Sequence, residues 1–465
     1  MLHDKDFFED MEEMSEVLGS LSIPSERAVL GTTPAMRPHQ HLQFFSVIFS
    51  SHLIKATVEI EPNVVAHIFR QTVELFREGN FEGFQPHQPP AEYVEEVYKT
   101  QILNTVKNYI FHHLIIDFLM SELVARKIPA SNYPRLTSIE IMADKKIIYH
   151  FDVSIADQLE LKEWRHFAFK QPKRKKYKDL DKQVVAFVEN RGPSSRKNTS
   201  ATIEESDWVC FDANLGNVDK NALAPQLISS FWLRVGKQDV VEPFICQLIG
   251  KELDQSFYTN NLNINHQNPK CDDRSYNLLI SIKAIVKGSC FSLDMFKTMF
   301  KLKNKAEIHN KLMEVFSYRN DVSQRKAIIE EVFHLLLSKH RFEVPKHLVL
   351  RREEDIIDTL AKQPDYHVYK AQKDFGDYVE LLAEKQLKEE IIIDQIAYHE
   401  NIKVEMRDVG HYLHLLSNRR LKEFIYFKPV LEKVDDLSAP INTAILAQAV
   451  MREKTLNFII YTLTR

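Results

Sequence analysis

The sequence contains little glycine and little cysteine. Only 11 of its 465 residues are glycine, which disfavours folds that depend on glycine-rich phosphate loops or many tight hairpins and favours long helices. The four cysteines lie far apart, without a C-x-x-C pair, at Cys210, Cys246, Cys271 and Cys290. That spacing argues against a disulfide scaffold or a zinc site and favours a reducing compartment.

A long apolar run is also missing. The most apolar stretch, residues 110–120, carries His112, His113 and Asp117, and it is shorter than the roughly 20 apolar residues that span a bilayer. The N-terminus is acidic where a secretory signal would be basic and then apolar. No G-x-x-x-x-G-K-[ST] motif occurs. We therefore expect a cytoplasmic, soluble protein without membrane contact, cofactor or metal.

Charge of either sign is not in large excess. Lys and Arg number 61 against 65 Asp and Glu, a net charge of -4, so no global attraction to nucleic acid is expected, although a local patch remains possible. The composition is 44% hydrophobic and 27% charged, as in proteins that fold. The length exceeds what one hydrophobic core usually organises, which predicts two to four domains.

The first part of the chain combines an extension with an α+β unit. Residues 1–44 form an acidic extension, with seven acidic residues among the first 18. Alternating apolar residues at 54, 56, 58 and 60 predict a strand, and Pro62 suits the first position of a helix. A helical pattern follows from 91 to 127, and two more strands fit 137–142 and 146–153. Residues 45–160 are therefore predicted to pack a helix pair on a small antiparallel sheet.

The rest of the chain divides into three regions. Residues 161–199 form a basic linker, since eleven Lys or Arg face only three acidic residues between 165 and 197. Residues 200–287 are strand-like and rich in turns, with alternation at Leu278, Ile280 and Ile282. Residues 288–465 are almost entirely helical, and Pro345 and Pro364 mark breaks between helices.

Four strings in this order resemble the bacterial trigger factor family of ribosome-associated chaperones. GFQPHQPP (83–90) is similar to its G-F-R-x-G-K-x-P loop, and GKQDVVEPFICQLIG (236–250) to its isomerase segment. LLLSKHRFEVPKHLVLRREEDII (335–357) and AEKQLKEEIIIDQIAYHENIKVEMRDVGHYL (383–413) resemble two segments of its helical region. The resemblance covers about residues 45–465. The rival interpretation is an unrelated helical scaffold with an inserted β domain.

The resemblance implies an α+β multi-domain fold and an ATP-independent chaperone. The expected parts are a ribosome-binding domain, a small antiparallel FKBP-type domain and an elongated all-α C-terminal body with arms. The expected partners are nascent or unfolded polypeptides and the ribosome, with a possible homodimer away from the ribosome. The family also implies roles in protein transport and cell division.

The resemblance places a ribosome-docking loop at Phe84, Gln85, Pro86, His87 and Gln88. Phe84 matches the family's aromatic residue, whereas Gln85 and Gln88 stand where the family has basic residues. Two charge-assisted contacts are thus missing, each worth about 1.5–3 kcal/mol where buried. We expect weaker ribosome binding, or binding through the cationic run Lys173, Arg174, Lys175 and Lys176. The alternatives are a plain turn and a solvated linker.

The resemblance also raises the question of prolyl isomerase activity. Such a pocket works by enclosing the prolyl bond in a desolvated, aromatic environment and needs no nucleophile or metal. Ala213 stands where the family has an aromatic residue, Glu242 enters the expected I-P-G-F turn, and no glycine-rich turn is found. Enzyme activity is therefore uncertain. The candidate pocket residues, which are alternatively core aromatics and their neighbours, are Asp212, Phe231, Trp232, Val241, Phe244 and Tyr258.

Client binding by the helical region requires exposed apolar side chains interspersed with polar groups. The candidates, each of which has a core position as its alternative, are Leu413, Leu415, Leu416, Phe427 and Leu446. Two other functions remain open: an active peptidyl-prolyl isomerase and a helical scaffold for one specific partner.

Overall fold

The protein is described by a computed structural model. The structure describes residues 41–50, 52–78, 81, 83–84, 89–126, 128, 130, 134–142, 146–156, 159–161, 163–174, 176–189, 202–215, 228–236, 243–262, 276–288, 293–418, 420–429, 433–434, 437–438 and 440–465. The predicted acidic extension lies outside these residues except for its last four positions.

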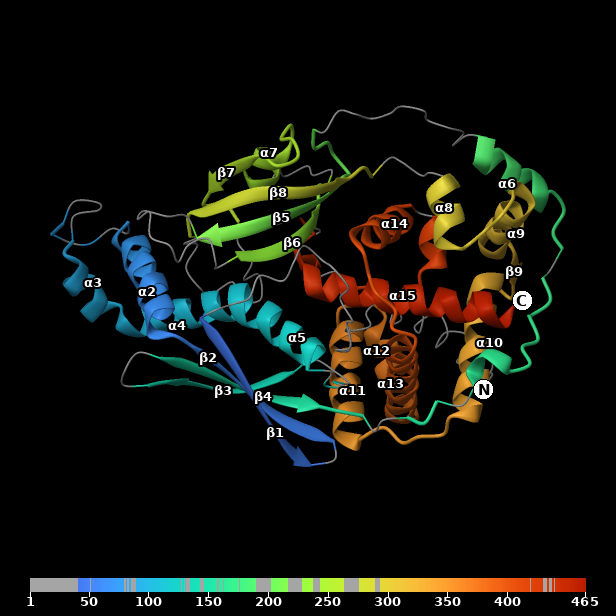
Figure 1. Cartoon of the computed structure of the whole chain (residues 1–465), viewed down its shortest axis with the longest axis horizontal. Coiled ribbons are helices and arrows are strands. Elements are labelled where there is room, and N and C mark those ends of the chain that lie inside the picture. Colours follow the sequence, from blue (N-terminus) through green and yellow to red (C-terminus); the bar gives the residue numbers. More distant parts are fainter. Residues whose placement is uncertain are drawn as a thin grey trace.

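The N-terminal region is an antiparallel sheet with helices on one face (Figure 1). The strands follow the order β1-β2-β4-β3 and are β1 (Leu42–Ser50), β2 (Leu53–Ile60), β3 (Arg135–Ile141) and β4 (Ile147–Ser154). Ile54, Ala56, Val58 and Ile60 are buried, because alternate residues of a strand point to the same face. The predicted α+β character is confirmed, although the sheet begins at Leu42, within the segment that the sequence assigned to the extension.

The helices of this region begin at Pro62, as predicted. They are α2 (Pro62–Arg77), α3 (Ala91–Val97), α4 (Lys99–Ile110), the π-helical turn η1 (Phe111–Ile115) and α5 (Ile116–Ala125). The pattern predicted as one helix from 91 to 127 is thus divided at Tyr98 and contains a π-helical turn. Such turns occur frequently at functional sites, and this one carries the buried side chain of His113.

The middle region contributes a five-stranded antiparallel sheet in the order β13-β6-β5-β8-β7. Its elements are β5 (Trp208–Leu215), β6 (Ile228–Arg234), α7 (Pro243–Leu248), β7 (Ser256–Thr259) and β8 (Leu278–Val286). The fifth strand, β13 (Ile441–Asn442), comes from the C-terminal region and pairs with Trp232 and Phe231 of β6. The C-terminal region therefore completes the middle sheet.

The C-terminal region is mainly helical, with a few two-residue strands. Its elements are α8 (Leu293–Met299), α9 (Lys305–Phe316), β9 (Tyr318–Arg319), β10 (Val322–Ser323), α10 (Gln324–Lys339), α11 (Lys346–Ala361), α12 (Tyr366–Lys370), α13 (Phe375–His399), α14 (Met406–Leu416), η4 (Leu421–Phe424), β11 (Lys433–Val434), β12 (Leu437–Ser438) and α15 (Thr443–Leu463). In Figure 1, α15 runs through the middle of this region.

Buried ion pairs connect the long helices of this region. Glu390 of α13 lies 2.9 Å from Arg352 of α11 and 3.3 Å from Arg452 of α15, measured from carboxylate oxygen to guanidinium nitrogen. Arg452 also lies 3.1 Å from Asp394. Because an unpaired charge is costly in a buried site, these contacts favour one arrangement of α11, α13 and α15.

The linker is more ordered than its composition suggests. It contains the short helix η2 (Trp164–His166) and the helix α6 (Leu180–Glu189). Leu180 and Val184 of α6 are buried in one cluster with Leu312 of α9. The basic segment between η2 and α6 therefore runs along the outside of the C-terminal helices (Figure 1).

Candidate functional site

The predicted docking loop is described at Gly83 and Phe84, and residues Gln85, Pro86, His87 and Gln88 lie outside the described residues. Gly83 has φ +86°, a left-handed conformation that glycine adopts without a steric cost. Phe84 follows with 39% of its surface exposed, and its ring centroid lies 5.3 Å from that of Tyr93 on α3. An aromatic residue is thus presented at the tip between α2 and α3.

The candidate isomerase residues lie on both faces of the middle sheet. Phe231 and Phe244 both contact Phe211, at centroid distances of 6.1 and 5.4 Å, on the face that meets the N-terminal helices. Trp232 belongs to the opposite core, shared with the C-terminal helices. Because neighbouring residues of a strand point to opposite faces, Phe231 and Trp232 cannot line the same side.

The remaining isomerase candidates are separated from the aromatic core. Asp212 lies on the face of Trp232, where Ser230 Oγ donates a hydrogen bond to its carboxylate and Lys283 Nζ lies 3.7 Å away. Tyr258 is 58% exposed on β7. Val241 lies outside the described residues. The described candidates therefore do not surround one common cavity.

The face of Phe231 is covered by the N-terminal region. His113 of η1 packs edge-on against Phe231 at 5.9 Å, and its Nδ1 lies 3.0 Å from Ser229 Oγ. His113 also stacks on Tyr109 at 4.2 Å. Burial lowers the pKa of His113 to about 3, so the imidazole is neutral near pH 7 and acts as a packed, hydrogen-bonded core group.

The candidate client-binding residues are mostly interior. Leu413, Leu415 and Leu446 are buried in the core that α14 and α15 share, and Phe427 is buried against α10 and α13. Leu416 is half-buried against the same core as Leu413. These apolar side chains face neighbouring helices. They are therefore core residues, which was the alternative to client binding.

An exposed apolar surface occurs instead on β1, which sequence reasoning did not single out. Phe45, Val47, Ile48 and Phe49 are 48%, 69%, 74% and 66% exposed. We call the Phe45, Val47 and Phe49 side, which faces away from the helices, the β1 face. The sequence signal is the run FFSVIF, which puts apolar residues on both sides of an edge strand. Such a strand can associate with another polypeptide through its side chains and its edge.

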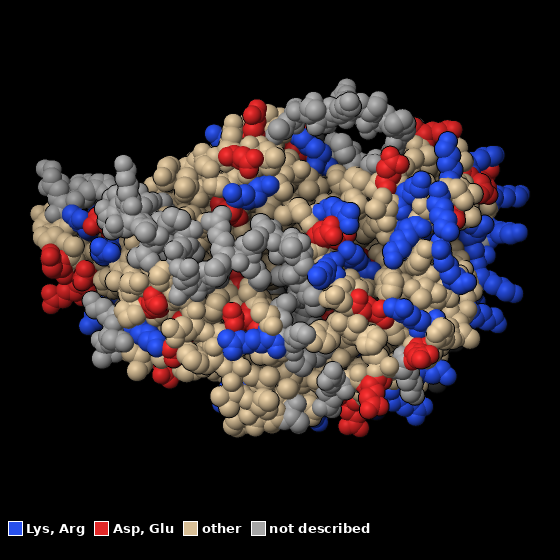
Figure 2. Space-filling model, in the orientation of Figure 1, with Lys and Arg blue, Asp and Glu red and all other residues tan. Residues whose placement is uncertain are grey.

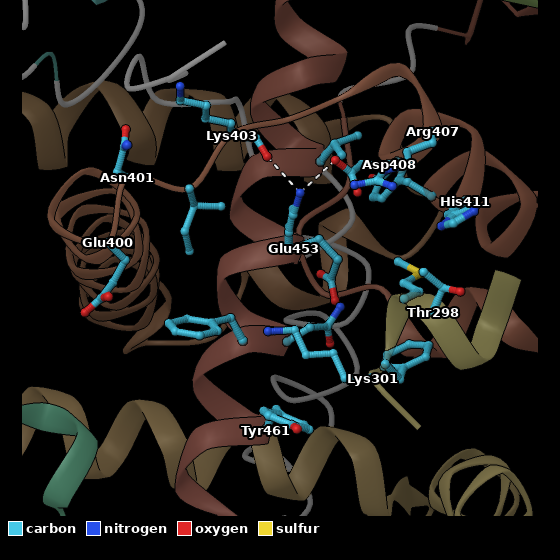
Figure 3. Close-up of a pocket in the computed structure, with 18 residues that line it drawn as sticks. Thr298, Lys301, Glu400, Asn401, Lys403, Arg407, Asp408, His411, Glu453 and Tyr461 are labelled. Atoms are coloured by element: carbon cyan, nitrogen blue, oxygen red, sulfur yellow. Dashed lines mark hydrogen bonds and ion pairs between the residues drawn. The ribbon is translucent and has the colours of Figure 1, made fainter. Parts of the chain in front are cut away.

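A cavity of about 410 Å³ lies where the end of α8, the turn after α13, α14 and α15 meet (Figure 3). Phe300, Phe458 and Tyr461 contribute aromatic rings to it. Lys301 Nζ lies 4.9 Å from the ring centroid of Phe458 and 5.2 Å from that of Tyr461. This volume falls in the range of pockets that bind small ligands and would also accept side chains of an extended peptide.

The carboxylates around this cavity already have partners. Asp408 accepts a 2.7 Å hydrogen bond from Lys454 Nζ, which also donates to the carbonyl of Lys403 at 2.8 Å (dashed lines in Figure 3). Glu400 pairs with Arg165, and Glu453 lies 3.4 Å from Arg325. The cavity thus offers aromatic surface beside carboxylates that already have partners, an arrangement suited to binding apolar groups.

The cationic run of the linker is exposed where it is described. Lys173, Arg174 and Lys176 are exposed, and Lys175 lies outside the described residues. Tyr177 donates a hydrogen bond to the carbonyl of Tyr318 on β9. The run is therefore held against the C-terminal region.

Within the described ranges, no group of three or more His, Cys, Asp or Glu side chains is placed to hold a metal ion. No helix in that same part of the chain combines the length and the apolar character needed to cross a bilayer.

These observations describe a multi-domain α+β protein whose candidate sites are surfaces for binding. The family model "Bacterial trigger factor protein (TF)" matches residues 48–189, and the model "Bacterial trigger factor protein (TF) C-terminus" matches residues 304–460. The chain belongs to the trigger factor family, and the predicted resemblance is confirmed.

The individual relatives have low sequence identity to this chain but align with most of its length. The trigger factor of Desulfatibacillum aliphaticivorans is 21% identical over 71% of this chain and 77% of its own. That of Clostridium beijerinckii is 21% identical over 75% and 87%. That of Geotalea daltonii is 25% identical over 71% and 77%. A solved structure of the trigger factor chaperone aligns at 13% identity with 90% of this chain and 99% of its own, with a TM-score of 0.35.

Proposed function

We propose that this protein is an ATP-independent chaperone that binds nascent or unfolded polypeptides in the cytoplasm, near the ribosome exit, and assists their folding. The observation that carries the proposal is the exposed β1 face in a member of the trigger factor family. Unfolded chains expose apolar side chains, and covering them on an apolar surface is favourable by about 25 cal/mol per Å². Binding of this kind needs no nucleotide.

The cavity of Figure 3 supports the same function at a second place. Its rings lie beside carboxylates that already have partners, so an apolar or aromatic client side chain can enter without breaking those ion pairs. We expect the β1 face to provide most of the contact area and the cavity to hold single side chains.

The proposal includes weak ribosome contact through the tip that presents Phe84. The aromatic residue and the two flanking helices are retained, whereas Gln85 and Gln88 supply no charge. Replacing Gln85→Arg and Gln88→Lys restores two cationic donors next to Phe84 in the sequence and should strengthen co-sedimentation with ribosomes. Unchanged co-sedimentation would argue that the loop does not dock.

We also propose that the isomerase domain is degenerate. The packing of Phe231 and Phe244 around Phe211, with His113 above them, supports this, because a prolyl substrate needs that apolar volume. A protease-coupled assay on a proline peptide should show little or no acceleration. A rate close to that of active FKBP-type enzymes would overturn this part of the proposal.

Association of two copies is a further part of the proposal. An apolar edge strand favours pairing with a second sheet edge, so we expect a homodimer through β1 at high concentration. Sedimentation velocity across a concentration series tests this, and substitution of Phe45, Val47 and Phe49 by serine should shift the equilibrium towards monomer.

The main test is suppression of aggregation without nucleotide. The full chain should suppress the aggregation of two unrelated unfolded clients at equimolar ratio, and the serine variant of the β1 face should not. Failure of the unmodified protein with both clients would contradict the proposal. Capture of a single stoichiometric partner would favour a specific scaffold instead.

A further inference from the structure

Cationic side chains gather over α6, α9 and β9, on the right-hand side of the molecule in Figure 2. They come from the linker, from the segment that enters α9 and from β9, and the linker part is more than a hundred residues away in sequence from the other two. We call the following exposed residues the basic surface: Lys173, Arg174, Lys176, Lys178, Lys303, Lys305 and Arg319. The linker run is thus only one part of a larger surface.

The charges of this surface are largely uncompensated. Of the seven side chains, none forms an ion pair within 4 Å with a carboxylate in the described part of the chain. Asp179 and Asp181, the acidic residues next to the run, are engaged elsewhere: Asp179 lies 2.7 Å from Lys182 and Asp181 lies 2.9 Å from His309. The surface therefore keeps a net positive charge.

The pKa of Asp181 reflects the positive charge around it. Its pKa lies below the usual value of an aspartate, first because of the hydrogen bond from His309 and also because of the positive charge of Arg174. Asp181 thus stays ionised and paired with α9 at neutral pH.

The basic surface is held in place by contacts on both sides of the linker run. Gln324 Nε2 donates a 3.3 Å hydrogen bond to the carbonyl of Pro172, and Tyr177 donates to the carbonyl of Tyr318. Phe187 of α6 packs on Phe316 of α9 at 5.5 Å. A surface that is ordered before binding loses less conformational freedom when a partner docks.

The shape of the surface favours a linear polyanion. The run from Lys173 to Lys178 can extend over up to roughly 17 Å, and α9 beside it is about 18 Å long. Such lengths match several successive phosphates of a nucleic acid, since each strand of a DNA duplex carries one phosphate for about every 3.4 Å of helix axis. Tyr177, 40% exposed within the run, adds a ring on which an unpaired base can stack.

We infer that the basic surface is a binding site for the phosphate backbone of RNA, formed jointly by the linker, the start of α9 and the β9–β10 hairpin. This inference rests on the proposed function near the ribosome and assigns RNA contact to a surface remote from the Phe84 tip. Binding uses backbone charge, so it is largely independent of sequence and falls steeply with salt.

The test is fluorescence polarisation of labelled RNA with the full chain across a series of salt concentrations. A 20-base-pair RNA duplex, the DNA duplex of the same sequence and a 20-nucleotide single strand are compared as probes. The variant combines Lys173→Ala, Lys176→Ala, Lys303→Ala and Lys305→Ala. Its matched control combines Lys99→Ala, Lys362→Ala, Lys370→Ala and Lys373→Ala, four exposed lysines outside the basic surface.

The unmodified chain should bind the RNA duplex, and the basic-surface variant should bind at least tenfold more weakly at low salt. The slope of log affinity against log salt should also become shallower, by about 0.9 for each lost phosphate contact. The control should behave like the unmodified chain. Because all eight lysines are exposed, circular dichroism and aggregation suppression should be unchanged in both variants.

Three outcomes would overturn the inference: no RNA binding at low salt, equal losses in the variant and the control, or an unchanged salt slope in the variant. Binding of a peptide of residues 1–18, without RNA binding, would assign the surface to the chain's own acidic segment and also overturn it. Normal aggregation suppression alongside any of these would show that the chaperone proposal survives. Loss of suppression in the unmodified protein would instead contradict the chaperone proposal.

Discussion

The β1 face and the basic surface differ in almost every property that controls binding. The β1 face is an apolar side of an edge strand in the N-terminal sheet, whereas the basic surface is assembled from charged side chains of the linker and of the C-terminal region. In Figure 1, β1 and α6 lie on opposite sides of the molecule. Apolar binding is weakly affected by salt, and charge-based binding is screened by it. These differences favour client binding and RNA binding as separate activities of one chain.

The middle sheet packs against both the N-terminal and the C-terminal helices. Phe231 faces the N-terminal helices, and Trp232 faces the C-terminal helices. Trp208 Nε1 donates a 2.8 Å hydrogen bond to Ser417 at the end of α14. Because the sheet has a packed core on each face, it should hold the N-terminal and C-terminal regions in a fixed relative position.

The largest expected effect is a loss of stability on truncating a core residue of the middle sheet. Trp232→Ala removes a fully buried side chain that packs beside Ile441 of β13, and it should lower the free energy of unfolding by about 3–5 kcal/mol. Urea denaturation followed by circular dichroism measures this. Tyr258→Ala, on the exposed outer strand of the same sheet, is the control and should cost much less; equal losses would contradict the packing argument.

The second largest effect concerns the β1 face. Serine at Phe45, Val47 and Phe49 removes the apolar side chains that clients would cover, about 1 kcal/mol each for partial burial. Client affinity should fall about a hundredfold, as measured by fluorescence anisotropy of a labelled unfolded protein, while RNA binding stays unchanged. Serine at the exposed residues Thr100, Ala361 and Ala371 provides a matched control. Normal client binding by the β1 variant would show that the β1 face is not the client-binding surface.

The third prediction concerns the loss of folding stability at low pH. His113 has its pKa lowered by burial to about 3 in the folded state, below the 6.5 of an unfolded histidine. The unfolded chain therefore binds the proton more readily, and stability present above pH 6.5 is lost as the pH falls towards 3. Linkage gives a loss of about 2 kcal/mol between pH 7 and pH 5 from this residue.

Comparison with a variant isolates this contribution. His113→Phe keeps a ring against Tyr109 and Phe231 but cannot titrate, so its unfolding free energy should change less between pH 7 and pH 5. Urea denaturation at both pH values is the measurement. The same pH dependence in the unmodified protein and in His113→Phe would show that other groups are responsible.

The smallest expected effect concerns the hydrogen bond that holds the linker run of the basic surface. Tyr177→Phe removes the hydroxyl that donates to Tyr318 but keeps the ring. The linker run should become less well positioned, and RNA affinity should fall severalfold, in line with about 1 kcal/mol for one hydrogen bond. Tyr398→Phe, an exposed tyrosine at the end of α13, should leave RNA affinity unchanged. A larger loss in the control than in Tyr177→Phe would contradict this role.

Local features of the fold were predictable from sequence. Apolar alternation predicted β2, and Pro62 predicted the start of α2, because both depend on residues close together in the chain. The pairing of β13 with β6 was not predicted, since two residues near position 441 carry no local signal for a partner more than 200 positions away. The helix α6 was hidden within a run that composition identified only as basic.

The candidate sites divide in a similar way. The exposure of Lys173 and Arg174 follows from their charge, and their neighbours Lys303 and Arg319 depend on tertiary packing that the sequence does not display. Leu413 and Leu446 carry the same apolar character whether they face solvent or a neighbouring helix, so periodicity alone could not place them in the core.

Client affinity measured with and without saturating duplex RNA shows whether clients and RNA occupy separate surfaces. If the β1 face and the basic surface act separately, a labelled unfolded client should bind the full chain with the same affinity in both conditions, because the ligands occupy different surfaces. Client release by RNA, at a concentration that matches RNA binding to the basic surface, would contradict the account and indicate a single shared site.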